Sequence, residues 1–417
     1  MSPVIHHRVV FLTSFVLTAA LASAACGGGA HSPQATHHPA ATAMADSPSS
    51  KMPGPPIAAV REVVDRYFGV EVGDAYRWME TPGSAEFDGW LRGQDAFARS
   101  ELARLPGRVQ LTARTTELAK MGARVEGVRK AGDKYFYLTR PAGAELWRLC
   151  VRDQRSAAER VLVDAERLSR EGAHASIDYF VPSPDGKLVA FGISTNGSEE
   201  TSLQVIEATT GRVLSERVDR TGFANLSWLP DGRAFFYMRY PKLAPGTPSS
   251  EGSRRMRVYV HVLGTSAEAD RAVFGFGVTP SVSVSEDDFP FVMASAGSAH
   301  VVGWIQHGVR SEWTLYTALS ADIVRGNLSW RKIADVEDGI STFAMHNDEI
   351  FALTHRDAPR SKLVRSDLAR GVLSGAKVVV PESDVVLQEI SPPRPTHCML
   401  LSSRRRSSTY DGFRTRR

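Results

Sequence analysis

The chain has 417 residues, of which 42% are hydrophobic and 23% charged, a composition that indicates folded domains and excludes global disorder. Its net charge of +4 is unevenly placed, because residues 394–417 carry seven Arg against the single acid Asp411, a net of +6. The rest of the chain is therefore slightly acidic, at about −2. A basic tail on a near-neutral body is not the clustered cationic face that nucleic-acid binding requires, so we expect no nucleic-acid partner.

The N-terminus has the features of an export signal. Two His and one Arg at positions 6–8 precede an apolar run at residues 9–22, which is short for a transmembrane helix. Small residues then lead into Cys26, a pattern that resembles a bacterial lipoprotein signal with Cys26 as the lipidated residue. An ordinary signal peptide cut near Ala25 is the alternative. We expect residues 1–26 to direct export to the periplasm or cell envelope, with membrane attachment only through the lipid.

A linker and a helical segment follow the signal. Residues 27–59 are rich in Ala, Ser, Pro and Gly, which predicts a disordered linker. Residues 60–122 then show helical spacing of apolar side chains. Ser84 suits the N-cap of a first helix, Pro106-Gly107 ends it, and a second helix is expected over 109–121.

Beyond residue 122 the hydrophobic period changes from that of a helix to that of a strand. Pro-Asp-Gly turns recur at 184–186 and 230–232, and Asn196-Gly197 marks another tight hairpin. Short strands group into five units, near residues 127–163, 179–218, 226–274, 281–334 and 340–380, and residues 384–390 start a possible sixth. Repeats of this length and strand content are typical of a β-propeller.

Three segments carry more specific motifs: Asp74-Ala-Tyr-Arg-Trp-Met-Glu80, the hairpin stretch 179–202, and a Thr-x-x-x-Ala-Pro-x-x-x-Leu pattern at 354–363. All three resemble the prolyl oligopeptidase family of serine peptidases. The resemblance covers about residues 65–390. It implies a mainly β fold, an incomplete β-propeller with about five to six blades of the seven expected in the family. It also implies that the preceding helical segment packs on the family's hydrolase domain.

The strand pattern stops near Ile390. We expect propeller blades over 123–390, followed at 391–417 by an aberrant basic tail, because its Pro-rich start and Ser/Arg run show no strand alternation. A frameshift or a gene truncation near Ile390 would explain this change in composition. A genuine basic tail is the alternative.

Catalysis in this family needs a nucleophilic Ser in a Gly-x-Ser-x-Gly turn, followed by Asp and His, in a C-terminal hydrolase domain. The 417 residues contain no Gly-x-Ser-x-Gly, no His-Glu-x-x-His and no phosphate-binding Gly-rich motif. We therefore predict no catalytic residue, no metal site and no cofactor in this chain, and no peptidase activity of the chain alone.

A few single residues merit attention. The segment from Phe223 to Gly232 resembles a family pattern whose Phe lies on the propeller face towards the hydrolase domain and helps line the substrate pocket. The resemblance thus assigns Phe223 to substrate binding, and a core aromatic is the alternative. Cys150, in an apolar run, is expected to be a buried small hydrophobe. Six His lack ligand-like spacing and are expected at the surface, with one or two of them facing the propeller channel as the alternative: 174, 261, 300, 307, 346 and 355.

The family's activity is serine-type endoproteolysis of short peptides after proline, with the propeller controlling substrate entry. By resemblance this chain is the N-terminal propeller part of such an enzyme. Its natural packing partner is then the hydrolase domain, and its ligands are short proline-containing peptides. A lipid-anchored propeller that binds peptides or a protein partner without catalysis is the alternative.

Overall fold

The computed structural model describes residues 54–81, 83–223, 225–394, 397–404 and 407–414. The signal segment with Cys26, and the linker up to residue 53, lie outside these ranges. Between Met121 and Gly122 the described chain divides into two compact units, which are treated separately below.

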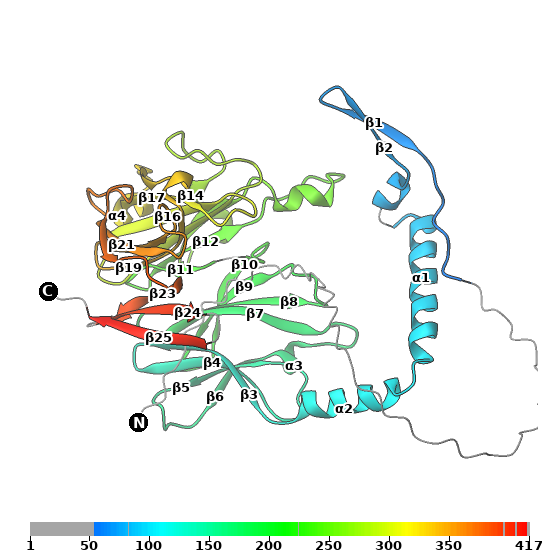
Figure 1. Ribbon diagram of the computed structural model, residues 1–417. Coiled ribbons are helices and arrows are strands. Elements are labelled where there is room, and N and C mark those ends of the chain that lie inside the picture. The colour runs from blue at the N-terminus through cyan, green and yellow to red at the C-terminus, as the bar shows by residue number, and fades with distance from the viewer. Residues whose placement is uncertain (1–53, 82, 224, 395–396, 405–406, 415–417) are drawn as a thin grey trace, which may run out of the picture. The chain divides into compact units, whose positions relative to one another are not determined.

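The N-terminal unit is a hairpin followed by helices (Figure 1). Its elements are β1 (Val63–Tyr67), β2 (Val70–Asp74), the 3₁₀ helix η1 (Arg77–Glu80), α1 (Ala85–Ala103) and α2 (Arg108–Lys120). The predicted cap is confirmed, because Ser84 Oγ accepts a hydrogen bond of 3.3 Å from the backbone N–H of Phe87. The predicted end of the first helix is also confirmed, since Gly107 adopts a φ of +78° between the helices.

The motif at residues 74–80 forms a local network inside this unit. The Arg77 guanidinium pairs with Asp65 and, at 2.8 Å, with Asp74. Trp78 packs edge-on against Trp90 at 6.3 Å between ring centroids. Neither α1 nor α2 contains a buried residue, however. The large apolar side chains exposed on them are Leu91, Leu102, Val109, Leu111 and Leu118.

The second unit contains five four-stranded antiparallel sheets, each a meander in chain order (Figure 1). Sheet 1 is β3 (Arg124–Ala131), β4 (Lys134–Arg140), β5 (Arg148–Arg152) and β6 (Arg160–Asp164). Sheet 2 is β7 (Ala175–Pro182), β8 (Leu188–Thr195), β9 (Ser202–Glu207) and β10 (Val213–Val218). Sheet 3 is β11 (Ser227–Trp228), β12 (Ala234–Arg239), β13 (Arg257–Val262) and β14 (Arg271–Gly275). Sheet 4 is β15 (Phe289–Ala294), β16 (His300–Gln306), β17 (Trp313–Leu319) and β18 (Arg331–Ala334). Sheet 5 is β19 (Ile340–His346), β20 (Glu349–Thr354), β21 (Lys362–Asp367) and β22 (Lys377–Val380).

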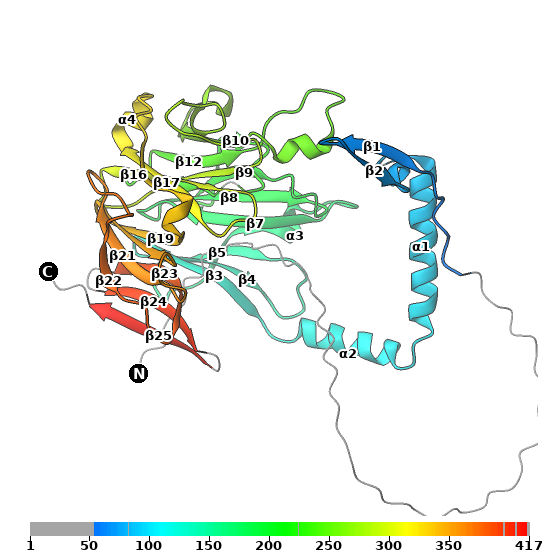
Figure 2. The same ribbon diagram turned by 45° about the horizontal axis from the view of Figure 1, so that its top comes forward.

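Five short helices lie in the connections: α3 (Ala165–Leu168), η2 (Ser249–Ser253), η3 (Ala267–Ala269), α4 (Ser320–Arg325) and η4 (Val336–Asp338). These sheets correspond to the five predicted units, so the mainly β propeller fold is confirmed. The sheets are not closed into a ring. Figure 2 shows the same succession of sheets from a second direction.

The hydrophobic core lies in the seams between consecutive sheets. One cluster of buried side chains joins sheets 1 and 2, and others join sheets 2 and 3, sheets 3 and 4, and sheets 4 and 5. Cys150 is fully buried on β5, which confirms the prediction of a small core residue. Each sheet therefore depends on its neighbours for burial, as expected for a repeat fold.

Tight hairpin turns connect the strands, and two hairpin tips meet between sheets 1 and 2. Asn196 and Gly197 have φ of +55° and +66°, which confirms the predicted hairpin turn. Gly186 and Gly232, at the ends of the two Pro-Asp-Gly turns, have φ of +70° and +67°. Gly132, at the tip of sheet 1, donates a 3.1 Å hydrogen bond to the Pro184 carbonyl of sheet 2.

The prediction of a tail without strands after Ile390 is wrong. A sixth sheet contains β23 (Val386–Arg394), β24 (His397–Arg404) and β25 (Ser407–Arg414), paired antiparallel. Pro392 and Pro393 disfavour a regular strand, because Pro has no backbone N–H to donate to the neighbouring strand. They fall where the β23–β24 register shifts, between Ser391 and Arg394, and a bulge of this kind tolerates Pro. Residues 384–390 do begin a sixth unit, as expected.

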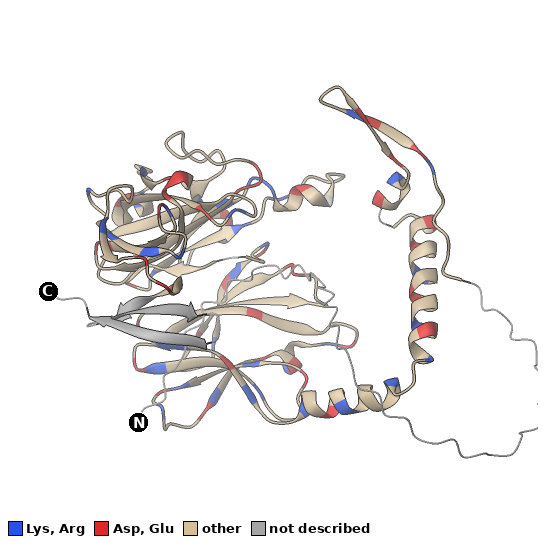
Figure 3. Cartoon of the chain, viewed as in Figure 1, with Lys and Arg blue, Asp and Glu red and all other residues tan. Residues whose placement is uncertain are grey.

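Charged residues of both signs are interspersed over the described strands, loops and helices (Figure 3). Within the described residues, no helix has the length and apolar character needed to cross a bilayer.

Candidate functional site

Phe223 lies in the loop that leaves β10 and enters β11, and its side chain is 47% exposed. The alternative of a core aromatic is therefore wrong. The residues on both sides of Phe223 show how the loop is held.

Arg220 and Thr221, shortly before Phe223, are hydrogen-bonded to segments next to strands β9 and β12, and Gly222 packs closely there. Arg220 exchanges hydrogen bonds with Tyr240, which follows β12: the Tyr240 N–H donates to the Arg220 carbonyl at 3.0 Å, and the Arg220 guanidinium donates to the Tyr240 carbonyl at 2.9 Å. Thr221 is fully buried, and both its N–H and its hydroxyl donate to the Thr201 carbonyl. Gly222 lies so close to Tyr240 and to the Glu199 carbonyl that an added Cβ would come within 3.0 Å and 2.8 Å of them.

The residues after Phe223 re-enter the core. Leu226 is buried, and the indole of Trp228 on β11 is 5% exposed. The Trp228 indole N–H donates a 3.0 Å hydrogen bond to the Val181 carbonyl of sheet 2. The exposed phenyl ring of Phe223 thus lies between two anchored residues, Thr221 before it and Trp228 after it.

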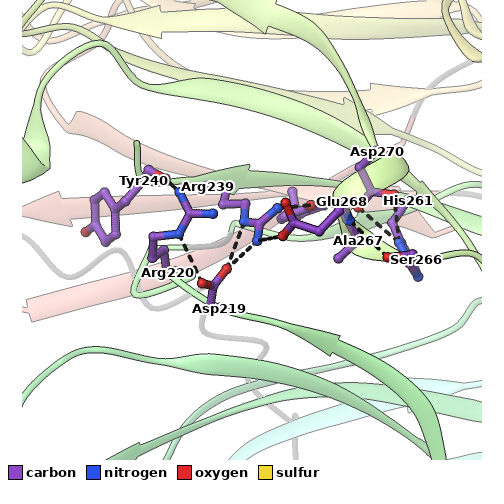
Figure 4. A network of polar contacts seen from close by, with 10 residues as sticks. Asp219, Arg220, Arg239, Tyr240, His261, Ser266, Ala267, Glu268 and Asp270 are labelled. Atoms are coloured by element: carbon purple, nitrogen blue, oxygen red, sulfur yellow. Dashed lines mark hydrogen bonds and ion pairs between the residues drawn. The ribbon is translucent and has the colours of Figure 1, made fainter. Parts of the chain in front are cut away.

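A polar network lies beneath the start of this loop (Figure 4). Arg239, the last residue of β12, has a side chain that is only 7% exposed. Its guanidinium pairs with Asp219, donates at 3.0 Å to Glu268 of η3, and donates at 3.3 Å to the Ala267 carbonyl. Asp219 in turn forms an ion pair of 3.2 Å with Arg220. Loop, strand and 3₁₀ helix therefore meet at one guanidinium.

The charge states in this network follow from burial and pairing. Burial alone would lower the pKa of Arg239, but the hydrogen bonds to Asp219 and Glu268 outweigh it and raise that pKa. Burial pushes the pKa of Asp219 upward, and its bonds to Arg239 and Arg220 reverse this, so the pKa lies below its usual value. The network is consequently ionic at neutral pH.

A second buried group adjoins the first through η3. The His261 side chain on β13 is fully buried, and its Nδ1 lies 2.9 Å from Asp270 Oδ1. The Tyr237 hydroxyl donates to Asp270 Oδ2 at 2.7 Å. Burial, reinforced by Asp270, raises the pKa of Tyr237. The prediction that His261 lies at the surface is wrong, because β13 is a central strand and a carboxylate compensates the ring there.

The other paired histidines join loops, and none forms a metal site in the described part of the chain. His300 lies 2.9 Å from Asp348, and His307 lies 3.1 Å from Asp288. His355 lies 3.3 Å from Glu312. The described residues contain no group of three or more His, Cys, Asp and Glu side chains with the geometry to hold a metal ion.

Sequence reasoning missed Arg239, Asp219 and Glu268. One signal was available: Arg239 directly follows the apolar run Ala234-Phe-Phe-Tyr-Met238 in a strand whose residues are all buried. A cation at the end of such a strand needs anions from elsewhere in the chain. One anion, Glu268, comes from the β13–β14 connection of the same sheet, and the other, Asp219, comes from the segment that joins sheets 2 and 3.

The family model of the prolyl oligopeptidase N-terminal β-propeller domain matches residues 55–406. The chain belongs to this family. The matched range includes the helical segment and the five four-stranded sheets, and it extends beyond Ile390 to the end of β24, before β25.

Curated relatives agree with this assignment. A prolyl endopeptidase of Elizabethkingia meningoseptica is 26% identical over 329 residues, which cover 78% of this chain and 44% of the relative. Prolyl oligopeptidase A of Galerina marginata is 23% identical over 350 residues, covering 77% and 46% respectively. The chain thus spans less than half the length of these relatives.

Solved structures share the fold. One comes from a structural and mechanistic study of two prolyl endopeptidases; it is 28% identical, has a TM-score of 0.74, and the match covers 85% of this chain and 50% of that one. Prolyl oligopeptidase B of Galerina marginata, bound to a 35-residue hydrolysis and macrocyclisation substrate, has a TM-score of 0.72 at 20% identity, with coverage of 86% and 52%. At 20% identity, this second match shows only that the two proteins share a fold.

Proposed function

We propose that this chain is the propeller part of a prolyl-oligopeptidase-like serine peptidase whose catalytic Ser, Asp and His lie outside these 417 residues. In this role the propeller admits short proline-containing peptides to a hydrolase domain, and Phe223 lines the peptide-binding surface. The observation that carries the proposal is the exposed Phe223 ring on a loop fixed at both ends. The family assignment and the prolyl endopeptidase relatives support it.

The chain alone is expected to be inactive. The purified chain should not cleave a chromogenic Gly-Pro substrate and should not be labelled by a fluorophosphonate probe, because the sequence holds no Gly-x-Ser-x-Gly. If the purified chain is labelled by the probe and also cleaves the substrate, the proposal that the catalytic residues lie outside this chain is wrong.

A chimera tests the positive part of the proposal. This chain joined to the hydrolase portion of the Elizabethkingia meningoseptica relative should cleave the Gly-Pro substrate. Replacing Phe223 by Ala in the chimera should raise KM about fivefold, because the half-exposed ring would no longer add roughly 1 kcal/mol of apolar contact with the peptide. Val309→Ala, at a fully exposed side chain of the β16–β17 loop, is the matched control and should leave KM unchanged. A folded chimera with equal KM for the Phe223→Ala and parent forms would refute the role of Phe223.

The alternative is a lipid-anchored propeller that binds peptides or a protein without catalysis. Reading the gene beyond codon 417 in all three frames discriminates the two. A Gly-x-Ser-x-Gly in any frame supports the peptidase, and its absence from every frame supports the binding protein.

Export and lipidation of Cys26 belong to the same proposal and rest on the sequence pattern alone. Cys26→Ser should move the protein from the membrane fraction to the soluble periplasmic fraction. Unchanged membrane association of that variant would exclude the lipid anchor.

A further inference from the structure

Arg239 occupies a position where a hydrophobic residue would serve packing alone. All six residues of β12 are buried, and the first five are apolar or aromatic. A buried guanidinium loses its hydration, and replacing buried ion pairs by apolar side chains of similar size is often neutral or stabilising. Packing alone therefore does not explain a charged residue here, and the groups bonded to the guanidinium indicate its role.

The partners of Arg239 and Tyr240 are the first residues of the Phe223 loop. Arg239 holds Asp219 through its guanidinium, and Tyr240 holds Arg220 through its backbone. Two consecutive residues at the end of β12 thus clamp two consecutive residues of the loop. Thr221 continues the attachment through its two bonds to the Thr201 carbonyl, so three successive residues, Asp219, Arg220 and Thr221, are bonded to neighbouring segments shortly before Phe223.

The other side of the guanidinium is fixed to sheet 3. Glu268 and the Ala267 carbonyl belong to η3, in the connection between β13 and β14. The planar guanidinium presents several N–H groups in a fixed geometry, so that it can hold Asp219 and η3 at the same time. A Lys ammonium, a single point of charge on a flexible stem, cannot reproduce this arrangement.

We propose that Arg239 is a positioning residue that holds residues 219–223 in one conformation through Asp219. It does not touch the peptide. That this segment serves peptide binding rests on the proposed function. The attachment of Asp219 to Arg239, called the clamp below, is a property of this chain alone and can be measured without any substrate.

Hydrogen exchange of the full chain tests the clamp. In Arg239→Met, the amides of residues 219–226 should exchange about tenfold faster, a local loss equivalent to about 1.4 kcal/mol. The amides of β7–β9 should be unchanged, and so should the urea midpoint, because Met fills the buried site. Arg239→Lys should also accelerate the hydrogen exchange of these loop amides. Arg212→Met is the matched control, because Arg212 pairs with Glu207 in the β9–β10 hairpin and has no bond to the loop.

Asp219→Asn provides a second variant in case Arg239→Met does not fold. The Asp219 side chain is 60% exposed, so the substitution removes the charge without opening the core. It should give the same acceleration confined to the loop. The proposal is overturned if loop exchange stays at the level of the parent protein in both variants. It is equally overturned if exchange rises throughout sheets 2 and 3 together with a lower urea midpoint, because Arg239 would then be a structural residue only.

Kinetics of the chimera separate this inference from the proposed function. With a mobile loop, KM for the Gly-Pro substrate should rise several-fold in Arg239→Met while kcat stays constant. Faster loop exchange with an unchanged KM would refute the role of Phe223 in peptide binding and leave the clamp standing.

Discussion

The seam between sheets 1 and 2 depends on two glycines that face each other. A Cβ at Gly132 would lie 2.4 Å from the Asp185 carbonyl oxygen, and a Cβ at Gly186 would lie 2.4 Å from the Ala131 carbonyl oxygen. Both glycines have positive φ, +53° and +70°. Neither obstacle is a flexible side chain, so an alanine at either position has to push two backbone segments apart.

The expected cost of Gly132→Ala has two parts. The left-handed conformation costs a residue with a Cβ roughly 1–2 kcal/mol. The steric conflict with backbone adds about 1–3 kcal/mol, the usual range for overpacking. The sum is a large fraction of the 5–15 kcal/mol that stabilises a typical domain.

Gly211→Ala is the matched control. Gly211 has a φ of +73°, and no atom lies within 4 Å of the position its Cβ would take. Gly211→Ala should therefore lose only the stability that the left-handed conformation costs, without the steric part. Urea unfolding, followed by both Trp fluorescence and circular dichroism to check that the transitions coincide, should place Gly132→Ala about 1–3 kcal/mol below Gly211→Ala.

A double variant tests the physical reason. Once Gly132→Ala has separated the two tips, Gly186→Ala meets less resistance, so the double variant should lose about 1–3 kcal/mol less than the sum of the single losses. Equal losses for Gly132→Ala and Gly211→Ala, or simple additivity of the two seam substitutions, would refute the reasoning.

Three further outcomes are expected. Burial, with the nearby Glu159 adding to it, raises the pKa of Cys150 to about 12, so its thiol should resist iodoacetamide at pH 8 in the folded chain and react in urea, as peptide mass spectrometry can show. The bonds of Asp348 to His300, Ser298 and backbone N–H groups outweigh its burial and lower its pKa, so its contribution to stability is present above about pH 4, the unfolded value, and is lost as pH falls through the folded pKa. Asp348→Asn should accordingly flatten the acid side of the unfolding profile, and an unchanged slope would exclude this account. Limited proteolysis should cut within residues 54–121 first, because α1 and α2 bury no side chain; survival of that segment at the longest digestion times would contradict it.

The repeat pattern made most of the fold predictable from the sequence. Alternating apolar residues, together with turns such as Asn196-Gly197 and Pro184-Asp-Gly186, specify hairpins through local backbone preferences. The predicted cap at Ser84 is local in the same way, since it involves a hydrogen bond between residues three apart in sequence. Phe223 was found because its surrounding motif resembles the family, and its exposure then followed from the structure.

The rest depended on contacts between distant residues. The strand β23 was missed because two prolines oppose a regular ladder, whereas a register shift in its pairing with β24 accommodates them. The burial of His261 depended on Asp270 and that of Arg239 partly on Glu268, both from the β13–β14 connection of sheet 3, whereas Asp219 comes from the segment that joins sheets 2 and 3. Local preferences, acting over a few residues, determined the strands and turns from the sequence by itself. The charges in the seams and the support beneath Phe223 were decided only by the tertiary structure, because burial and pairing depend on which sheets meet.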